Sequence, residues 1–259
     1  MKTQATLNDF FVAAYEMGAE RTPVPTWASK TENPFGLDNA FGSAVQRIEV
    51  RSVPGTFQLV HLLTRDECRR FIETTEGLGY TEDASVSLPR SVRRNENLVW
   101  VADDATHDII WERCKTLLHD GSNLFNGKQP LGLNRRFRFY KYAEGDFFKP
   151  HTDGSWPGSR MVGDRLVADA YGDRQSQMSF LILLNETFTG GETAFYVDKN
   201  DPAKPAKRNE DVSSVAVRTP AGGALCFPHG GHPLHCLHSS ETIRSGAKYI
   251  IRTDLLFEK

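Results

Sequence analysis

The sequence predicts an α+β, mainly β protein: a double-stranded β-helix, or jelly-roll, core buttressed by N-terminal helices. Two helical patterns come first, and short β-rich segments then fill residues 135–257. Helices followed by a run of short strands separated by turn residues are typical of this architecture. The continuous apolar run at residues 179–184 predicts a strand that is buried on both faces.

The N-terminal region is predicted to stand apart from this core. Apolar residues spaced three and four apart predict an amphipathic helix over residues 7–20. A stretch rich in Pro, Gly and Asn predicts an irregular arm over residues 21–46. We therefore divide the chain into an N-terminal helix and arm, residues 1–50, and one core domain, residues 51–259.

The first elements of the core are assigned from local signals. Residues 56–62 are β-rich and predict a strand. Thr64 is predicted to begin a helix over residues 65–77, with Glu67 three residues on completing a capping box. Apolar residues on one side predict a second helix over residues 104–120.

The pair His151 and Asp153 is the first candidate for a functional site. On a β-strand, residues i and i+2 point to the same side, so both side chains can reach one ion. Gly145 fits a turn between this strand and the one before it. The pair alone is a weak signal, because an ordinary exposed strand end can carry the same residues.

The C-terminal segment offers further ligands. Four histidines lie here, at residues 229, 232, 235 and 238, either as a metal-binding tract or as a polar loop. Lys248, Arg252 and Asp254 then share one face of a predicted strand. Such a face cannot lie in a dry core unless its charges are paired or bind something, so it lines solvent or a polar cavity. Two imidazoles and one carboxylate are the ligand set of non-haem Fe(II) oxygenases.

Composition narrows the class of protein. The 259 residues include 31 basic and 33 acidic residues, for a formal net charge of −2, so no overall charge recruits nucleic acid or a membrane. No apolar run approaches the ~20 residues that span a bilayer, and the N-terminus lacks a secretory apolar core. The four cysteines have no CxxC spacing and are interpreted as reduced thiols of a cytoplasmic protein. The pattern does not specify an oligomeric state.

Several motifs occur in one order along the chain. They are Tyr142-x-x-Gly145-x-x-Phe148-x-x-His151-x-Asp153, Gly190-Gly191-Glu192-Thr193, Pro220-Ala-Gly-Gly-Ala-Leu-Cys-Phe227, Leu237-His238 and Gly246-x-Lys248-Tyr249. Together they resemble the prolyl 4-hydroxylase-like branch of the Fe(II)/2-oxoglutarate-dependent dioxygenases, over roughly residues 54–257. Phe148 stands where this family usually has tyrosine, so that position packs but cannot donate a hydrogen bond.

The resemblance implies His151, Asp153 and His238 as the metal ligands. It selects His238 because the family's distal histidine lies ten residues before the basic residue, as His238 does before Lys248. Lys248 would then pair with the distal carboxylate of 2-oxoglutarate, and Tyr142 would donate a hydrogen bond to the same carboxylate. The implied cofactors are Fe(II), 2-oxoglutarate as co-substrate and O2, with ascorbate as a candidate reductant.

Arg252 departs from the family pattern. It points to the same side of the strand as Lys248 but lies about 13 Å further along, too far to share the co-substrate carboxylate. We hypothesise that Arg252, with Arg138, contacts the primary substrate. The alternative is a structural salt bridge from Arg252 to Asp254 or to a neighbouring strand.

Three further residues are candidates for substrate contacts. Arg94 and Asn95 lie in a polar loop, which either approaches the substrate, as the same region does in similar enzymes, or is a plain basic surface loop. Trp156 lies in residues 154–177, a long segment directly after the ligand pair. A loop of this length is usually functional or disordered, so residues 154–177 are a candidate active-site lid.

The sequence therefore predicts a 2-oxoglutarate-dependent dioxygenase that hydroxylates an unactivated C–H, with a prolyl residue of a peptide or protein as the leading substrate. The alternative substrate is a free amino acid or a small natural product. The intact carboxylate at Asp153 favours hydroxylation over halogenation. A non-catalytic metal- or 2-oxoglutarate-binding module, a cupin-type isomerase and a zinc protein are the remaining alternatives, and 2-oxoglutarate turnover would distinguish them from a dioxygenase. A nucleic-acid demethylase is disfavoured, because the chain is not basic.

Overall fold

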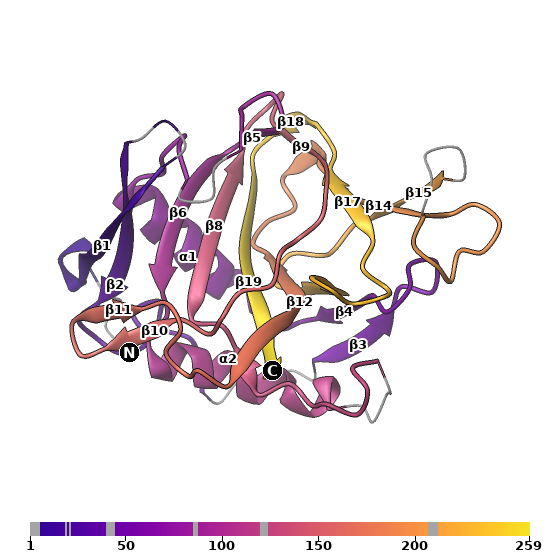
Figure 1. Ribbon diagram of the computed structural model, residues 1–259. Helices are drawn as coiled ribbons and strands as arrows, with labels where there is room; N and C mark the ends of the chain where they lie inside the picture. Colours follow the sequence, from indigo (N-terminus) through magenta and orange to yellow (C-terminus); the bar gives the residue numbers. More distant parts are fainter. Residues whose placement is uncertain are drawn as a thin grey trace.

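The structure is a computed structural model that describes residues 6–18, 20, 22–39, 45–84, 88–119, 124–206 and 212–259 (Figure 1). Within these residues, ten strands form one large sheet. In spatial order the large sheet contains β1 (Phe10–Met17), β2 (Pro23–Ser29), β6 (Glu96–Val101), β8 (Arg136–Tyr142), β19 (Lys248–Glu258), β12 (Arg174–Leu183), β16 (Ala224–Pro228), β4 (Phe57–Val60) and β3 (Gln46–Glu49), and β7 (Gly132–Leu133) pairs with β19.

A smaller, five-stranded sheet lies over one face of the large sheet (Figure 1). Its strands, in spatial order, are β15 (Val212–Val217), β14 (Thr193–Asp198), β17 (Leu237–Ser240), β9 (Phe147–His151) and β5 (Arg93–Arg94). Two short strand pairs complete the described β structure, β10 (Arg160–Val162) with β11 (Arg165–Val167) and β13 (Phe188–Gly190) with β18 (Ile243–Gly246). Two facing sheets joined in this way confirm the predicted mainly β, jelly-roll core.

Both predicted helices are present, α1 (Arg65–Leu78) and α2 (Asp104–Leu118). The predicted capping box begins α1: Thr64 Oγ1 accepts from the Glu67 amide at 3.1 Å, and the Glu67 carboxylate accepts from the Thr64 amide at 2.8 Å. Asp103 caps α2 by accepting a hydrogen bond from the amide of Thr106. No helix in the described part of the chain has both the length and the apolarity to cross a membrane.

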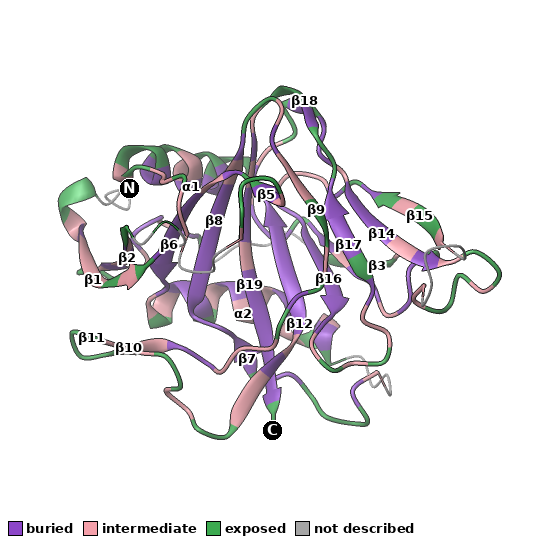
Figure 2. Ribbon diagram, turned by 45° about the horizontal axis from the view of Figure 1, so that its top comes forward, coloured by how far each residue is buried: buried purple, intermediate pink, exposed green. Residues whose placement is uncertain are grey.

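The main hydrophobic core lies between the two helices and the face of the large sheet that points away from the small sheet. Its centre is aromatic. The Phe71 ring of α1 stacks on Phe35 with centroids 4.2 Å apart, and Trp100 meets Phe35 edge-on at 4.9 Å. All three side chains are fully buried, as are most residues of the central strands (Figure 2). The helices therefore stiffen the sheet that carries half of the candidate site.

Replacing Phe71 by alanine is expected to lower the free energy of unfolding by about 3–5 kcal/mol. The variant loses the buried apolar surface of the ring, and the surrounding aromatic side chains cannot move in to fill the cavity that it leaves. Denaturant titration of the purified protein measures this. Arg69→Ala, an exposed position on the same helix, is the control and should leave the unfolding midpoint unchanged. A loss below about 1 kcal/mol for Phe71→Ala would show that α1 does not hold the sheet.

The opposite face of the large sheet points toward the small sheet and packs less uniformly. One apolar cluster, around Phe195 and Phe227, fills one end of the space between the sheets. A second, around Tyr140, Leu183 and Ile250, fills the other end. The polar residues of the candidate site lie between these two clusters, on the facing strands β8, β9, β17 and β19.

The predicted N-terminal helix is wrong. A 3-10 turn, η1 (Leu7–Asp9), leads into strand β1, which pairs antiparallel with β2 from Phe10 to Met17. β2 in turn joins β6, so this hairpin extends the large sheet and replaces part of the predicted irregular arm. Within the predicted N-terminal region, residues 1–5, 19, 21 and 40–44 lie outside the described residues. The domain boundary at residue 50 stays a prediction.

Candidate metal centre and co-substrate pocket

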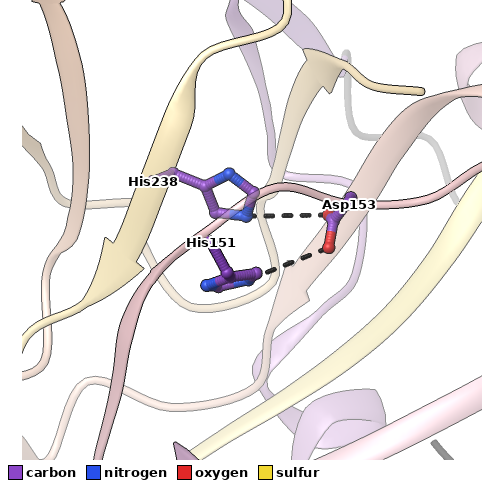
Figure 3. A group of neighbouring side chains, drawn as sticks. All are labelled: His151, Asp153 and His238. Atoms are coloured by element: carbon purple, nitrogen blue, oxygen red, sulfur yellow. Dashed lines mark ion pairs between the residues drawn. The ribbon is translucent and has the colours of Figure 1, made fainter. Parts of the chain in front are cut away.

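Three side chains converge in the space between the two sheets (Figure 3). His151 Nε2 lies 3.8 Å from Asp153 Oδ1, and His238 Nε2 lies 3.6 Å from Asp153 Oδ2. The candidate ligand atoms of all three residues lie within 4.8 Å of one another. Asp153 and His238 are buried and His151 is half-buried. Two imidazole nitrogens and one carboxylate around a single point can hold one metal ion.

Strand pairing brings this triad together. His151 and His238 are direct cross-strand partners on β9 and β17, so both side chains point into the same space. β9 is aimed there by the predicted turn at Gly145, whose φ of 82° favours glycine. The regular strand ends at His151, so Asp153 comes from the start of the following loop.

The hydrogen bonds of the two histidines orient their rings for metal binding. His151 Nδ1 donates to the Lys149 carbonyl at 2.8 Å, and His238 Nδ1 donates to the Cys236 carbonyl at 3.2 Å. A carbonyl can only accept, so each Nδ1 carries the proton and each Nε2 presents a lone pair to the centre. This is the tautomer that a metal ligand needs.

The charge states also suit a metal site. Burial, with the neighbouring His238, lowers the pKa of His151 to about 3, and burial likewise lowers the pKa of His238. Burial alone would raise the pKa of Asp153, but the Arg252 guanidinium and the hydrogen bond from Ser179 hold it well below its usual range. At neutral pH the centre therefore holds two neutral imidazoles and an ionised carboxylate, and metal binding requires no proton release.

A cavity of about 380 Å³ adjoins the triad. Apolar and cationic side chains make up much of its wall: Phe148, Leu181, Ile250 and Trp156, with Arg93, Lys248 and Arg252. Among the described residues that line it, Asp153 is the only carboxylate. The site thus combines a metal-binding triad with a partly apolar, positively charged pocket.

Comparisons with known proteins relate this architecture to solved structures. No protein-family model matches the chain, and no curated protein matches its sequence. The viral collagen prolyl hydroxylase of Paramecium Bursaria Chlorella virus-1, solved with 2OG, has 15% identity and a TM-score of 0.49 over 82% of this chain and 100% of that chain. A Pseudomonas putida prolyl-4-hydroxylase has 18% identity and a TM-score of 0.48 over 80% and 94% of the two chains.

One further structure decides the fold. A prolyl hydroxylase from Trichoplax adhaerens, in complex with a hypoxia inducible factor oxygen degradation domain peptide fragment, has a TM-score of 0.54 with 14% identity, over 79% of this chain and 84% of that chain. The chain has the prolyl 4-hydroxylase-like fold of the Fe(II)/2-oxoglutarate dioxygenases. This likeness concerns the fold, and within that fold the triad is placed where it could hold one metal ion.

The two residues predicted to bind 2-oxoglutarate are cross-strand neighbours. Lys248 begins β19 directly opposite Tyr142 on β8, and both line the cavity. Lys248 Nζ donates to the Gly191 carbonyl at 2.6 Å and to Ser240 Oγ at 3.1 Å. Burial raises the pKa of the Tyr142 phenol well above its usual value, so the phenol keeps its proton. An ammonium and a phenol, side by side, can bind one carboxylate.

The residues predicted to contact the substrate do not all reach the cavity beside the triad. Arg252 and Trp156 line it. Arg138 lies behind this wall, with its guanidinium carbon 5.3 Å from the Trp156 ring centre and its Nη1 atom 3.4 Å from Asp254. Arg252 is paired with Asp153 and with Asp254, so the predicted alternative, a structural salt bridge to Asp254, is present. A contact between Arg252 and the substrate stays a prediction.

Arg94 and Asn95 point elsewhere. Arg94 is exposed and its Nε atom pairs with Asp146 at 3.1 Å, while buried Asn95 donates to Asn97. Arg93, one residue earlier, lines the cavity beside Phe148, its cross-strand partner. Arg93 was not among the predicted site residues. Successive side chains of a strand point to opposite faces, so an inward Arg93 leaves Arg94 pointing outward.

The candidate lid, residues 154–177, divides into three parts, and the last of them, residues 174–177, is not a loop but the start of β12. Its first residues, including Trp156, border the cavity. Its middle forms the β10–β11 hairpin, which extends toward β1 and away from the triad (Figure 1). A lid movement of this segment stays a prediction.

Proposed function

We propose that this chain is an Fe(II)/2-oxoglutarate-dependent hydroxylase in which His151, Asp153 and His238 bind the metal. The observation that carries the proposal is the triad itself, with both Nε2 atoms facing one ionised carboxylate inside a jelly-roll core. Iron bound by these three residues would leave room for 2-oxoglutarate and O2, and would supply the oxidising power for C–H hydroxylation. The chain supplies the three metal ligands, the cationic side chains that line the cavity, and a partly apolar wall that keeps bulk water out.

We assign the distal carboxylate of 2-oxoglutarate to Lys248 and Tyr142. Both lie at the end of the cavity where β19 begins, and Ser240 and Gly191 hold the ammonium in place. Phe148 stacks on His151 with ring centroids 3.4 Å apart, and so covers one side of the metal centre. These groups bind and orient the co-substrate and exclude bulk water from it.

The leading substrate that we propose is a prolyl residue of a peptide or protein. Two observations support it: the prolyl 4-hydroxylase-like motifs of the sequence, and the fold shared with a hydroxylase solved in complex with a peptide fragment. A peptide would reach the metal through the cavity mouth near Trp156 and Arg93.

A second candidate substrate, a free amino acid or another small carboxylic acid, is favoured by the charge of the cavity. Three cations line it against one carboxylate: Arg93, Lys248, Arg252 and Asp153. A substrate carboxylate would meet cationic side chains in this cavity, and hydrogen bonds between a cation and a carboxylate are among the strong ones.

Succinate formation tests the proposed function. Protein loaded with Fe(II) without air and then exposed to air, with 2-oxoglutarate and ascorbate, is expected to produce succinate, and His151→Ala and Lys248→Ala are expected to lose it. Lys259→Ala, an exposed lysine just beyond β19, is the matched control and should retain activity. Absence of both succinate and any 2-oxoglutarate-induced change in the Fe(II) absorption spectrum would leave only a non-catalytic module.

The same assay separates the two substrates. A rise in succinate on adding proline-containing peptides, and none with free L-proline or small carboxylic acids, would support the peptide substrate. The reverse result would support the small carboxylic acid.

We also propose that the protein works in the cytoplasm. All four of its cysteines are free and buried, as a reducing compartment would leave them.

A further inference from the structure

Both oxygens of the Asp153 carboxylate are held by the protein. Arg252 Nη2 lies 3.3 Å from Oδ1, and Ser179 Oγ donates to Oδ2 at 2.6 Å. Each oxygen also faces one imidazole, Oδ1 toward His151 and Oδ2 toward His238. The carboxylate therefore cannot turn about its bond without breaking a buried ion pair and a buried hydrogen bond.

Arg252 is itself fixed from behind. The same Nη2 atom lies 3.4 Å from Oδ1 of Asp254, a fully buried carboxylate whose other oxygen pairs with Arg138. Arg252 and Asp254 both lie on β19, two residues apart, so the strand sets their relative position. One carboxylate thus anchors the guanidinium that holds the other.

Ser179 is fixed by His229, one of the four histidines that the sequence analysis left without a role. The single hydroxyl proton of Ser179 goes to Asp153, so Ser179 Oγ must accept from His229 Nδ1 at 2.8 Å. Burial lowers the pKa of His229, so the ring is neutral and its Nε2 accepts from Ser176 Oγ at 2.9 Å. Every hydrogen bond in this buried chain therefore has one direction, and the chain ends on Asp153.

We infer that Arg252, Ser179 and His229 are positioning residues, which hold the Asp153 carboxylate in the orientation that binds the metal. The inference rests on the proposed function, because it takes Asp153 as a metal ligand. Partners of metal ligands in other sites typically change metal affinity 10–100-fold when they are removed, because the ligand loses its preset orientation. We expect a change in metal affinity of the same size when Arg252 or Ser179 is replaced.

The test is titration of the metal-free protein with Mn(II), followed by the loss of the free-ion EPR signal. Arg252→Met and Ser179→Ala are expected to raise the Kd for Mn(II) roughly 10–100-fold. Arg252→Lys keeps the charge and His229→Asn keeps a donor near Ser179. Each should therefore lose less affinity than Arg252→Met and His229→Leu, respectively.

Arg113→Met is the matched control. Arg113 also forms a buried ion pair, with Nη2 2.7 Å from Glu67 Oε1, but it joins the two helices outside the cavity. This variant should lose thermal stability while it keeps the Mn(II) affinity of the wild type. Equal Mn(II) affinity in Arg252→Met, Ser179→Ala and wild type would overturn the inference, and so would an equal loss in Arg113→Met. Wild-type protein that binds no Mn(II) would instead overturn the proposed function, and the inference with it.

Discussion

Asp153→Ala is expected to abolish 2-oxoglutarate turnover and also to destabilise the metal-free protein, whereas His238→Ala should abolish turnover with little loss of stability. Both remove a proposed ligand. Asp153, however, is also a counter-charge of Arg252, because Asp153 and Asp254 together balance the guanidiniums of Arg252 and Arg138. Removing one partner of a buried ion pair costs about 3–5 kcal/mol, because the other charge stays behind. Removing a neutral imidazole should cost nearer the roughly 1 kcal/mol of an average substitution.

Chemical denaturation of the metal-free variants, beside a succinate assay of the Fe(II)-loaded ones, measures both effects. Asp153→Asn provides the isosteric comparison, since it keeps the shape and removes the charge. Equal stability of Asp153→Ala and His238→Ala would mean that Arg252 does not depend on Asp153 for its counter-charge. Retained succinate formation in either variant would contradict the proposed ligand set.

The affinity for 2-oxoglutarate is expected to fall as the pH rises through neutrality. Burial lowers the pKa of Lys248 to about 7 in the metal-free protein, and nearby Arg218 adds to the shift. Only the ammonium form can pair with a carboxylate, so the neutral amine must take up a proton when the co-substrate binds. For one such proton, the Kd should be about 50-fold weaker at pH 9 than at pH 7. Lys248→Met should weaken binding roughly 10- to 100-fold at pH 7, the loss of a charge-assisted hydrogen bond.

Calorimetry of 2-oxoglutarate binding to the Mn(II)-loaded protein measures the affinity, and buffers of different ionisation enthalpy report the proton taken up. Lys248→Arg is the control: its guanidinium stays charged across this range, so its affinity should not change with pH. A wild-type affinity that is flat from pH 7 to pH 9, with no proton uptake, would show that Lys248 is already charged before the co-substrate arrives.

The chemistry of the site was largely predictable from sequence, because its groups sit in short motifs with a strand period. His151 and Asp153 are two residues apart, although β9 ends at His151 and Asp153 begins the next loop. Lys248 and Arg252 share a strand face that was predicted to line solvent or a polar cavity. The partners of these residues were not predictable. Arg252 meets Asp153, and Ser179 meets His229, only because β12, β19 and the flanking loops fold against one another.

The two wrong predictions, the N-terminal helix and the inward placement of Arg94, also have physical causes. Residues 10–17 have apolar side chains at helical spacing, yet they pair along their whole length with β2 at the edge of the sheet. In a short apolar segment the helical and strand periods are hard to separate, and the strand partner decides. The placement of Arg94 differs from the prediction by a single residue, since β5 is only two residues long and turns Arg93, not Arg94, inward.

Strand β19 limits where the protein can accept insertions and deletions during evolution. Every second residue of β19 from Lys248 to Asp254 faces inward: Lys248, which we propose binds the co-substrate, then Ile250 in the cavity wall, then the charged pair Arg252 and Asp254. One inserted or deleted residue in this stretch would turn every later side chain of β19 to the opposite face of the sheet. The charged side chains would then point into the hydrophobic core and the apolar ones into the cavity. In the connection between β14 and β15, beyond Asp198, exposed residues such as those at 202–204 carry no such register. Descendants of this sequence can therefore gain or lose residues there, while β19 can vary in composition but keeps its length.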